Sequence, residues 1–247
     1  MIVTIIRKEF RSLFSAPSTW LILGALQFIF AWFFLARLDA YLQIQTQLAQ
    51  VANAPGVTLS VAAPLFGTLA LILMMLIPLF TMRLLAEERR NQTLALLLAA
   101  PISSKQIVLG KFLSLLLFIS LIIASCTVML SVLGWGTNLD FGLLVTNALG
   151  LCLLAASYIA LGLYLSALTK QPIVAAMSAI ALSFSLWLID VGSADNANLL
   201  RTLSPSAHAQ SLNSGLILSA DLIYFVVFVT TFLLLTIRRV NNNRHYS

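Results

Sequence analysis

Residues 82–111, MRLLAEERRNQTLALLLAAPISSKQIVLGK, separate two long apolar runs and so decide where the chain turns. The first nine of these positions hold five charged side chains: Arg83, Glu87, Glu88, Arg89 and Arg90. A leucine-rich stretch, a proline and a polar turn follow before the apolar residues resume. Charged side chains are costly inside hydrocarbon, so this segment predicts a loop outside the bilayer between two membrane spans.

The chain as a whole has the composition of a membrane protein. Of its 247 residues, 60% are hydrophobic and only 9% are charged, whereas a soluble domain carries about 25% charged residues. The two cysteines, Cys126 and Cys152, lie inside apolar runs and form neither a disulfide framework nor a metal-binding pair. We therefore expect the bilayer, and not one large aqueous core, to shape the fold.

The sequence carries none of the local motifs that indicate nucleotide binding, metal binding or catalysis. Gly110 and Lys111 could end a phosphate-binding loop, but Lys105 stands where that motif requires its first glycine. His208 and His245 have no partner at metal-ligand spacing, and no Ser/His/acid motif is present. We expect no enzyme activity and no cofactor in this chain.

Six apolar stretches are long enough to cross a membrane, for which about 20 residues are needed. The predicted spans are at about residues 18–36, 62–82, 108–133, 143–168, 172–190 and 220–237. We therefore predict an all-α membrane protein whose residues 1–247 form a single transmembrane domain. The interiors of these spans carry no Lys, Arg, Asp, Glu or His near the bilayer midplane, which argues against an ion-coupled carrier. Unwound backbone carbonyls could still bind Na⁺ in such a carrier.

The distribution of charge predicts the orientation of the spans. If the N-terminus is cytoplasmic, every basic residue except Arg37 and Arg201 falls on the cytoplasmic side, whereas five of the eight acidic residues fall outside. This is the asymmetry that the positive-inside rule describes. Both termini are then cytoplasmic, and the net charge of +6 reflects orientation and does not indicate a nucleic-acid partner.

Residues 1–16 predict an amphipathic helix at the cytoplasmic interface. Its apolar positions recur at helical spacing, with Glu9 as the exception among them, and Arg7, Lys8 and Arg11 take the opposite face. Two interpretations are open: a generic membrane-entry helix, or an elbow helix that moves with the first span.

Small residues recur every four positions in two of the spans, at 148, 152, 156 and 160 and again at 175, 179 and 183. Such stripes let helices approach closely. They are compatible with packing inside one subunit or with an interface between two subunits.

The loop after the second span predicts a short submembrane helix. Residues 93–98 form an apolar stretch too short to span, Pro101 ends it, and Ser103 or Ser104 can cap the next helix. The alternative is a solvated loop with ordinary flanking charges. On the same side, residues 169–171 form a tight turn between the fourth and fifth spans.

The segment MRLLAEERRNQTLALLLAAPISSKQIVLGKF resembles the permease subunits of ABC type-2 exporters, and within them the gliding-motility type. The shared pattern is an acidic pair, a basic residue, a threonine, a leucine-rich helix, a Pro-x-Ser turn and a Gly-Lys pair. A second resemblance lies in LSPSAHAQSLNSGLILSADLIYFVVFVTTFLLLT, near the C-terminus. Together they extend over nearly the whole chain. One departure is Asn91-Gln92-Thr93, where the family usually places a glycine before the threonine, so the start of the short helix stays open.

The resemblance implies that the short helix is a coupling helix, which docks into a groove on a separate ATPase subunit. The residues carried over to this role are Glu87, Glu88, Arg89, Arg90, Thr93, Leu94, Leu97 and Leu98, with charges that pair with the ATPase or orient the loop. A second, smaller contact is carried to Thr169, Lys170 and Gln171.

The resemblance also implies the partners of the chain. Two cytoplasmic ATPase subunits would bind ATP and Mg²⁺, and a second permease copy or a related permease would complete the pathway. An accessory extracytoplasmic subunit is compatible with this plan, and the location would be the bacterial cytoplasmic membrane. The alternatives are an ATP-independent secondary carrier and a non-transporting membrane anchor or assembly subunit.

Overall fold

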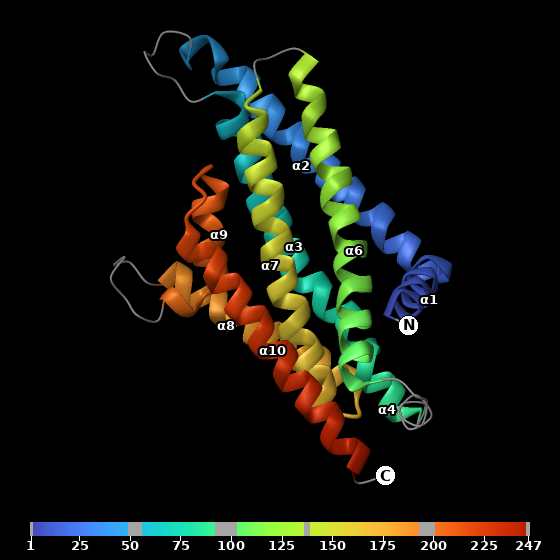
Figure 1. Ribbon diagram of the computed structural model, residues 1–247. Helices are drawn as coiled ribbons and strands as arrows, with labels where there is room; N and C mark the ends of the chain where they lie inside the picture. The colour runs from blue at the N-terminus through green and yellow to red at the C-terminus, as the bar shows by residue number, and fades with distance from the viewer. Residues whose placement is uncertain (1, 49–55, 92–102, 136–138, 193–200, 246–247) are drawn as a thin grey trace.

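The computed structural model describes residues 2–48, 56–91, 103–135, 139–192 and 201–245. These residues are almost entirely helical and include no strand, and their longest helices form an elongated bundle (Figure 1). The helices are α1 (Ile2–Ser15), α2 (Pro17–Leu48), α3 (Ala63–Met82), α4 (Glu88–Arg90), α6 (Ser104–Ser131), α7 (Phe141–Leu168), α8 (Pro172–Gly192), α9 (Pro205–Asn213) and α10 (Ser219–His245). Short π-helical turns, η1 (Thr58–Ala62) and η2 (Arg83–Glu87), flank α3, and 3₁₀ turns occur at η3 (Val132–Trp135) and η4 (Arg201–Leu203).

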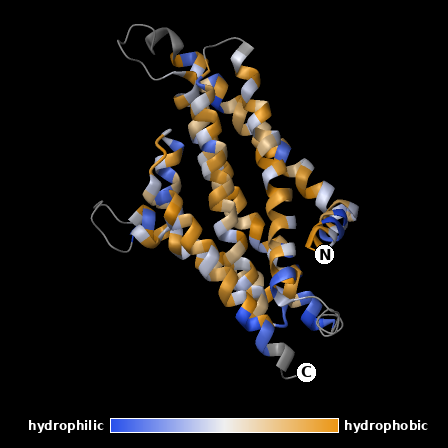
Figure 2. Ribbon diagram, viewed as in Figure 1, coloured by the Kyte–Doolittle hydropathy of each residue, from blue (hydrophilic) through white to orange (hydrophobic). Residues whose placement is uncertain are grey.

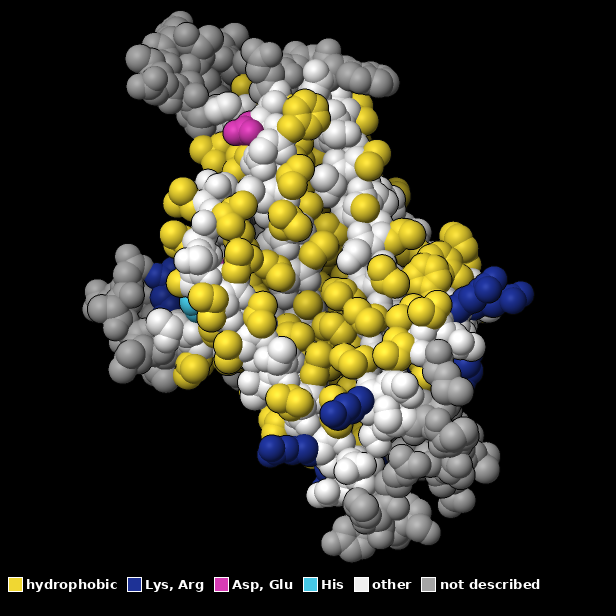
Figure 3. Space-filling model, viewed as in Figure 1, with side chains coloured by type: hydrophobic (Ala, Val, Ile, Leu, Met, Phe, Trp, Pro, Cys, Tyr) yellow, Lys and Arg dark blue, Asp and Glu magenta, His cyan; other side chains and the backbone are white. Residues whose placement is uncertain are grey.

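Six helices in the described residues are long and apolar enough to cross a membrane: α2, α3, α6, α7, α8 and α10. Each coincides with one of the six predicted spans. Figure 2 shows apolar residues along these helices and hydrophilic residues concentrated toward their ends. In the space-filling view, apolar side chains cover the middle of the visible face, and Lys and Arg gather toward the lower end and beside α1 (Figure 3). The fold is therefore an all-α membrane protein, as predicted.

The first two helices meet at a proline. Helix α1 ends at Ser15 and α2 begins at Pro17, whose missing N–H costs nothing at the start of a helix. Helix α2 then continues to Leu48, well beyond the predicted span, because no glycine or proline interrupts residues 25–48. Polar residues beyond Arg37 end the apolar run without ending the helix.

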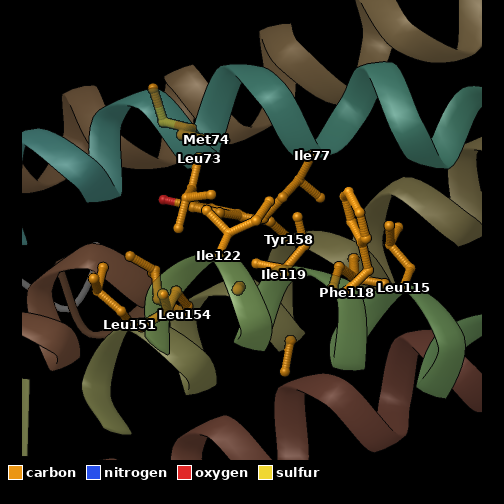
Figure 4. Close-up of a cluster of buried hydrophobic side chains, with 14 of the residues drawn as sticks. Leu73, Met74, Ile77, Leu115, Phe118, Ile119, Ile122, Leu151, Leu154 and Tyr158 are labelled. Carbon is orange, nitrogen blue, oxygen red and sulfur yellow. The ribbon is translucent and has the colours of Figure 1, made fainter. Parts of the chain in front are cut away.

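Helix α7 lies at the centre of the bundle and contacts α3, α6, α8, α9 and α10. Figure 4 shows side chains from α3, α6 and α7 packed into one buried cluster, including Leu73, Phe118, Ile122 and Leu154. Most of the small residues in the two stripes are buried in this single subunit; these are Ala156 and Ala160 of α7 and Ala175, Ala179 and Ser183 of α8. For those residues, packing inside one subunit is confirmed.

Helix α6 begins with the cap that the sequence predicted. The Ser103 hydroxyl accepts a hydrogen bond from the backbone N–H of Gln106 at 3.3 Å, and the Gln106 side chain accepts one from the Ser103 N–H at 3.2 Å. This reciprocal capping box satisfies two backbone donors that the first turn of a helix otherwise leaves free. The loop therefore re-enters the bundle at a defined position.

Candidate functional site

The predicted coupling residues divide into a described part and a part outside the described residues. Thr93, Leu94, Leu97 and Leu98 fall in 92–102 and lie outside them. Glu87 closes η2, and Glu88–Arg90 form α4. We call residues 83–91 the loop stem. The backbone from α3 stays helical through the stem, because the sequence RLLAEERR contains strong helix formers and neither glycine nor proline.

The loop stem is attached to α7 through Ser166. The Ser166 hydroxyl accepts hydrogen bonds from the backbone N–H groups of Leu85 (3.3 Å) and Ala86 (3.0 Å), and it donates one to the carbonyl of Met82 (3.2 Å). A π-helical turn disturbs the regular hydrogen-bond ladder of a helix. The fully buried Ser166 hydroxyl supplies hydrogen-bond partners for backbone groups of this π-helical turn.

Arg89 makes a second attachment to the same end of α7. Its guanidinium donates a hydrogen bond to the carbonyl of Ala167, one residue beyond Ser166. A free carbonyl is expected here, since the last turn of a helix has no intrahelical donors for its C=O groups. Arg89 is half-buried and so holds the stem in place more than it presents a charge to solvent.

The two predicted cytoplasmic contacts come together in one groove. A surface groove of about 580 Å³ is lined by Arg89, Arg90, Lys170, Gln171, Pro172 and Ile173. We call it the basic groove. Arg90, Lys170 and Gln171 are exposed. Thr169 shapes the turn, because its hydroxyl accepts a hydrogen bond from the Gln171 N–H at 3.1 Å. Segments about 80 residues apart in the sequence thus form a single surface.

Lys111 of α6 joins the loop stem to α1, an arrangement that was not predicted from the sequence. Its ammonium lies 2.7 Å from Glu88 Oε1 and 3.1 Å from Glu9 Oε1, and the lysine side chain is only 2% exposed. Burying a lysine is unfavourable unless carboxylates pair with it, and here two do. Glu88, predicted for the partner contact or for orienting the loop, is therefore held inside the protein. Glu9 was the one residue that broke the apolar pattern of α1, and this misfit was the available signal.

The described charges of the stem thus have two kinds of surroundings. Among the four predicted coupling charges, Glu88 and Arg89 are half-buried and bond to Lys111 of α6 and to α7, and Lys111 also binds Glu9 of α1, whereas Glu87 and Arg90 are exposed. Movement of the stem would consequently be transmitted to three other helices. Of these four residues, Glu87 and Arg90 are the ones a partner protein can reach.

A second polar cluster lies on the other half of the molecule, around α9. Asp190 of α8 accepts hydrogen bonds at Oδ1 from Arg201 (3.2 Å) and at Oδ2 from Ser206 (2.9 Å) and Gln210 (3.0 Å). Asp190 lines a cavity together with Leu151, Leu154 and Tyr158, which lie around the midpoint of α7. Figure 1 shows α9 beside the middle of the bundle, below the upper ends of α3 and α7.

Asp190 thus lies beside the middle part of α7, at the C-terminal end of the shorter helix α8. The sequence placed Asp190 at the outer end of the fifth span, and Asp190 does lie near the C-terminus of α8. Helix α8 is shorter than α7, with 21 residues against 28, and its residues Trp187 and Asp190 line the cavity beside the middle of α7.

His208 joins α9 to α10. Its Nδ1 lies 2.6 Å from Asp221 Oδ1, its Nε2 lies 3.0 Å from the carbonyl of Thr202, and its ring stacks on Tyr224 at 4.0 Å. The Tyr224 hydroxyl donates to the carbonyl of Leu203 at 2.6 Å. Because both ring nitrogens already face oxygen atoms, this geometry suits a structural role and not a catalytic one. Across the described residues, no three His, Cys, Asp or Glu side chains gather in a way that could hold a metal ion.

Comparison with known proteins places nearly the whole chain in one family. The family model described as ABC-2 family transporter protein matches residues 3–239. That range includes the loop stem, the basic groove and the six candidate membrane helices, except for the last residues of α10, and all of α1 but its first residue. No curated protein matches the chain.

Proposed function

Because the chain belongs to the ABC-2 family of transporter proteins, we propose that it is the permease subunit of an ATP-driven exporter, moved by separate ATPase subunits through the loop between α3 and α6. The family and the six candidate membrane helices make the chain a multi-pass transporter permease. The ATPase partner, the direction of transport and the coupling role of the loop belong to the proposal. The gliding-motility type stays a prediction from the sequence.

The observation that carries the proposal is the way in which the loop stem is attached. Lys111 connects the stem to α1 and α6, and Ser166 and Arg89 connect it to α7. A loop that transmits the movement of a partner protein must be rigidly attached to several helices, because a loosely attached loop would move without displacing them. Rigid movement of packed elements is a common way in which a local event changes a whole fold.

The basic groove supports the same assignment. It combines the exposed Arg90 of the stem with Lys170 and Gln171 of the turn between α7 and α8. A partner with an acidic rim that docks there would contact both elements at once. Residues 93–98, which the sequence predicts as the coupling helix, follow the stem in the sequence but lie outside the described residues.

Several parts of the assembly follow as expectations. Two ATPase subunits would bind ATP and Mg²⁺, so this chain itself needs no cofactor. A second permease copy would pack against exposed apolar side chains, which α2, α8 and α10 carry in number. Both termini and the basic groove would face the cytoplasm of a bacterial cell. Family membership favours this assignment over a stand-alone secondary carrier, and no observation favours a non-transporting anchor.

A charge-reversal experiment tests the proposal. The chain is co-expressed with a Walker-motif ATPase from the same genome that co-purifies with it, and Arg90→Glu is compared with Lys8→Glu. Both residues are exposed and both changes reverse one charge, but Lys8 lies on α1, outside the basic groove. We expect Arg90→Glu to abolish co-purification and stimulated ATPase activity, while Lys8→Glu retains both. Equal behaviour of the two variants, with normal membrane insertion, would refute the coupling assignment.

A further inference from the structure

We propose that a cavity enclosed by α3, α7, α8 and α9 binds an uncharged amphipathic molecule, and that Asn147 holds the polar head of this ligand. The cavity has a volume of about 250 Å³. Its walls are largely apolar and include Phe66, Met74, Leu151 and Leu154. Figure 4 shows Met74, Leu151 and Leu154 within the buried cluster that forms these walls. The site goes beyond the proposed function, since binding there requires no ATPase.

Asn147 is the residue that indicates a ligand. Its side chain lines the cavity and is 2% exposed, and neither Oδ1 nor Nδ2 has a hydrogen-bond partner. A side-chain amide offers two donors and an acceptor, and burying them unpaired is unfavourable. A leucine would fill the position without that penalty. Within the described residues, Asn147 is the one side chain of this cavity whose buried polar atoms lack a partner.

The other polar groups of the wall explain why the ligand should be uncharged. Both oxygens of Asp190 are occupied, by Arg201 on one side and by Ser206 and Gln210 on the other. Asp190 and Arg201 thus form an ion pair at the wall of the cavity. An anionic ligand would meet Asp190, and a cationic ligand would compete with Arg201. A hydroxyl or amide group, in contrast, can pair with the Asn147 amide at no cost in charge.

The position of the opening explains why the ligand should also be apolar over most of its surface. Three of the lining residues are exposed, namely Gly67 and Leu71 of the apolar helix α3 and Gln210 of α9, and we assign the entry to the α3 side. A molecule that enters there must first dissolve among lipid chains. The volume is slightly below the range of about 300–1,000 Å³ that is usual for drug-sized ligands. A small molecule, or the head of a longer one, therefore fits.

Trp187 lines the same cavity and provides a direct signal of occupancy. In a protein that keeps only this tryptophan, with Trp20, Trp32 and Trp135 replaced by phenylalanine, a brominated ligand in the cavity quenches its fluorescence. The probes are tribromoethanol, a small soluble alcohol, and a chain-brominated diacylglycerol, which is an uncharged lipid. They distinguish a free solute from a bilayer lipid as the source of the ligand. A protein that keeps only Trp32, which is exposed on α2, reports non-specific quenching.

We expect saturable quenching of Trp187 by at least one probe, and a half-saturating concentration at least tenfold higher in Asn147→Leu. Ser183→Ala is the matched control, because Ser183 is also buried without a partner but lies outside the cavity. Gly67→Leu, which places a bulky side chain at the opening where nothing lies within 4 Å of an added Cβ, should weaken binding without disturbing the core. Quenching by both probes that does not saturate, or that is the same in Asn147→Leu, Gly67→Leu and Ser183→Ala, would overturn the proposal.

Discussion

At the scale of single residues, Lys111 has the largest effect on how the cytoplasmic end is built. Three elements that are distant in sequence, α1, α4 and α6, meet at its ammonium. Two carboxylates face one ammonium, so one negative charge is in excess. Repulsion between the carboxylates favours an arrangement in which both contact the lysine and not each other. The triad ties the stem to α1 and α6. A buried ion pair is weak evidence for net stability, but removal of one partner is costly because it leaves a charge buried and unpaired.

Removal of Lys111 alone should therefore be damaging. Lys111→Met leaves Glu9 and Glu88, 16% and 18% exposed, facing each other without a cation. We expect a loss of roughly 3 kcal/mol in the free energy of unfolding, as is typical for breaking a buried ion pair. The measurement is thermal unfolding of the purified protein in detergent. The control is the triple variant Lys111→Met, Glu9→Gln, Glu88→Gln, which removes all three charges and should recover most of that loss. If the single and triple variants unfold alike, the triad does not hold the stem.

At the scale of the elements, the close contact between α3 and α7 determines the centre of the bundle. Gly162 of α7 faces Thr81 of α3, and a Cβ at Gly162 would clash with the threonine side chain. Four residues later, Ser166 bonds to the backbone of η2. Gly162 thus allows α3 and α7 to approach closely, and this close approach brings Ser166 within hydrogen-bond distance of η2. The packing of the two helices and the attachment of the stem therefore depend on each other.

Substitution of Gly162 by alanine tests this dependence. Gly162→Ala should destabilise the fold by about 1–3 kcal/mol, since overpacking a tight contact pushes the two helices apart. The same variant should weaken protection of the Leu85 and Ala86 amides in hydrogen exchange. Gly24→Ala is the control, because Gly24 lies in α2 with nothing within 4 Å of an added Cβ. There a gain of about 0.5–1 kcal/mol is expected from the better helix propensity of alanine. Equal effects at the two positions would contradict the role of Gly162.

At the scale of the whole molecule, the described residues present polar groups at both ends and apolar side chains between them. Lys and Arg gather toward the end that carries the stem, the basic groove and the C-terminal part of α10 (Figure 3). The exposed apolar residues along α2, α8 and α10 would be a liability in water but suit contact with lipid or with a second copy. Orientation in the membrane is the property of the whole molecule on which the proposed coupling depends.

Labelling of single cysteines tests that orientation. Cys126 and Cys152 are first replaced by alanine, and a cysteine is introduced at Gln43 or at Lys170, both of which are exposed. In intact cells, a membrane-impermeant thiol reagent should modify the cysteine at position 43 and spare the one at position 170. Inside-out vesicles should show the reverse. Modification of position 170 from outside would invert the proposed topology and remove the basic groove from the reach of a cytoplasmic ATPase.

Much of the fold was predictable, because the physics that decides it is local. Apolar runs of sufficient length must be helices in a bilayer, where every backbone polar group needs an internal partner. The capping box at Ser103 and the break between Ser15 and Pro17 depend on neighbouring residues in the same way. Helix α2 extends to Leu48, past the predicted end of the first span, because polar residues end a membrane span but do not end a helix.

The candidate site was predicted less completely. The sequence drew attention to residues 87–90 and 169–171, and tertiary structure showed that most of these line one groove. It also showed that Glu88 and Arg89 are held internally, which no spacing in the sequence expresses. The roles of Thr93, Leu94, Leu97 and Leu98 stay predictions.

The sequence by itself determined the class of protein, the number of membrane helices and the segments that lie between them, since length, apolarity and charge act on each segment alone. Tertiary structure decided which charges are available to a partner, which charges hold helices together and where α9 lies along the bundle. These properties arise only where elements far apart in the chain come within contact distance. The segment at residues 82–91 illustrates both: its charges place it outside the bilayer, whereas Lys111, Ser166 and Ala167, all on other helices, make it a rigid part of the bundle.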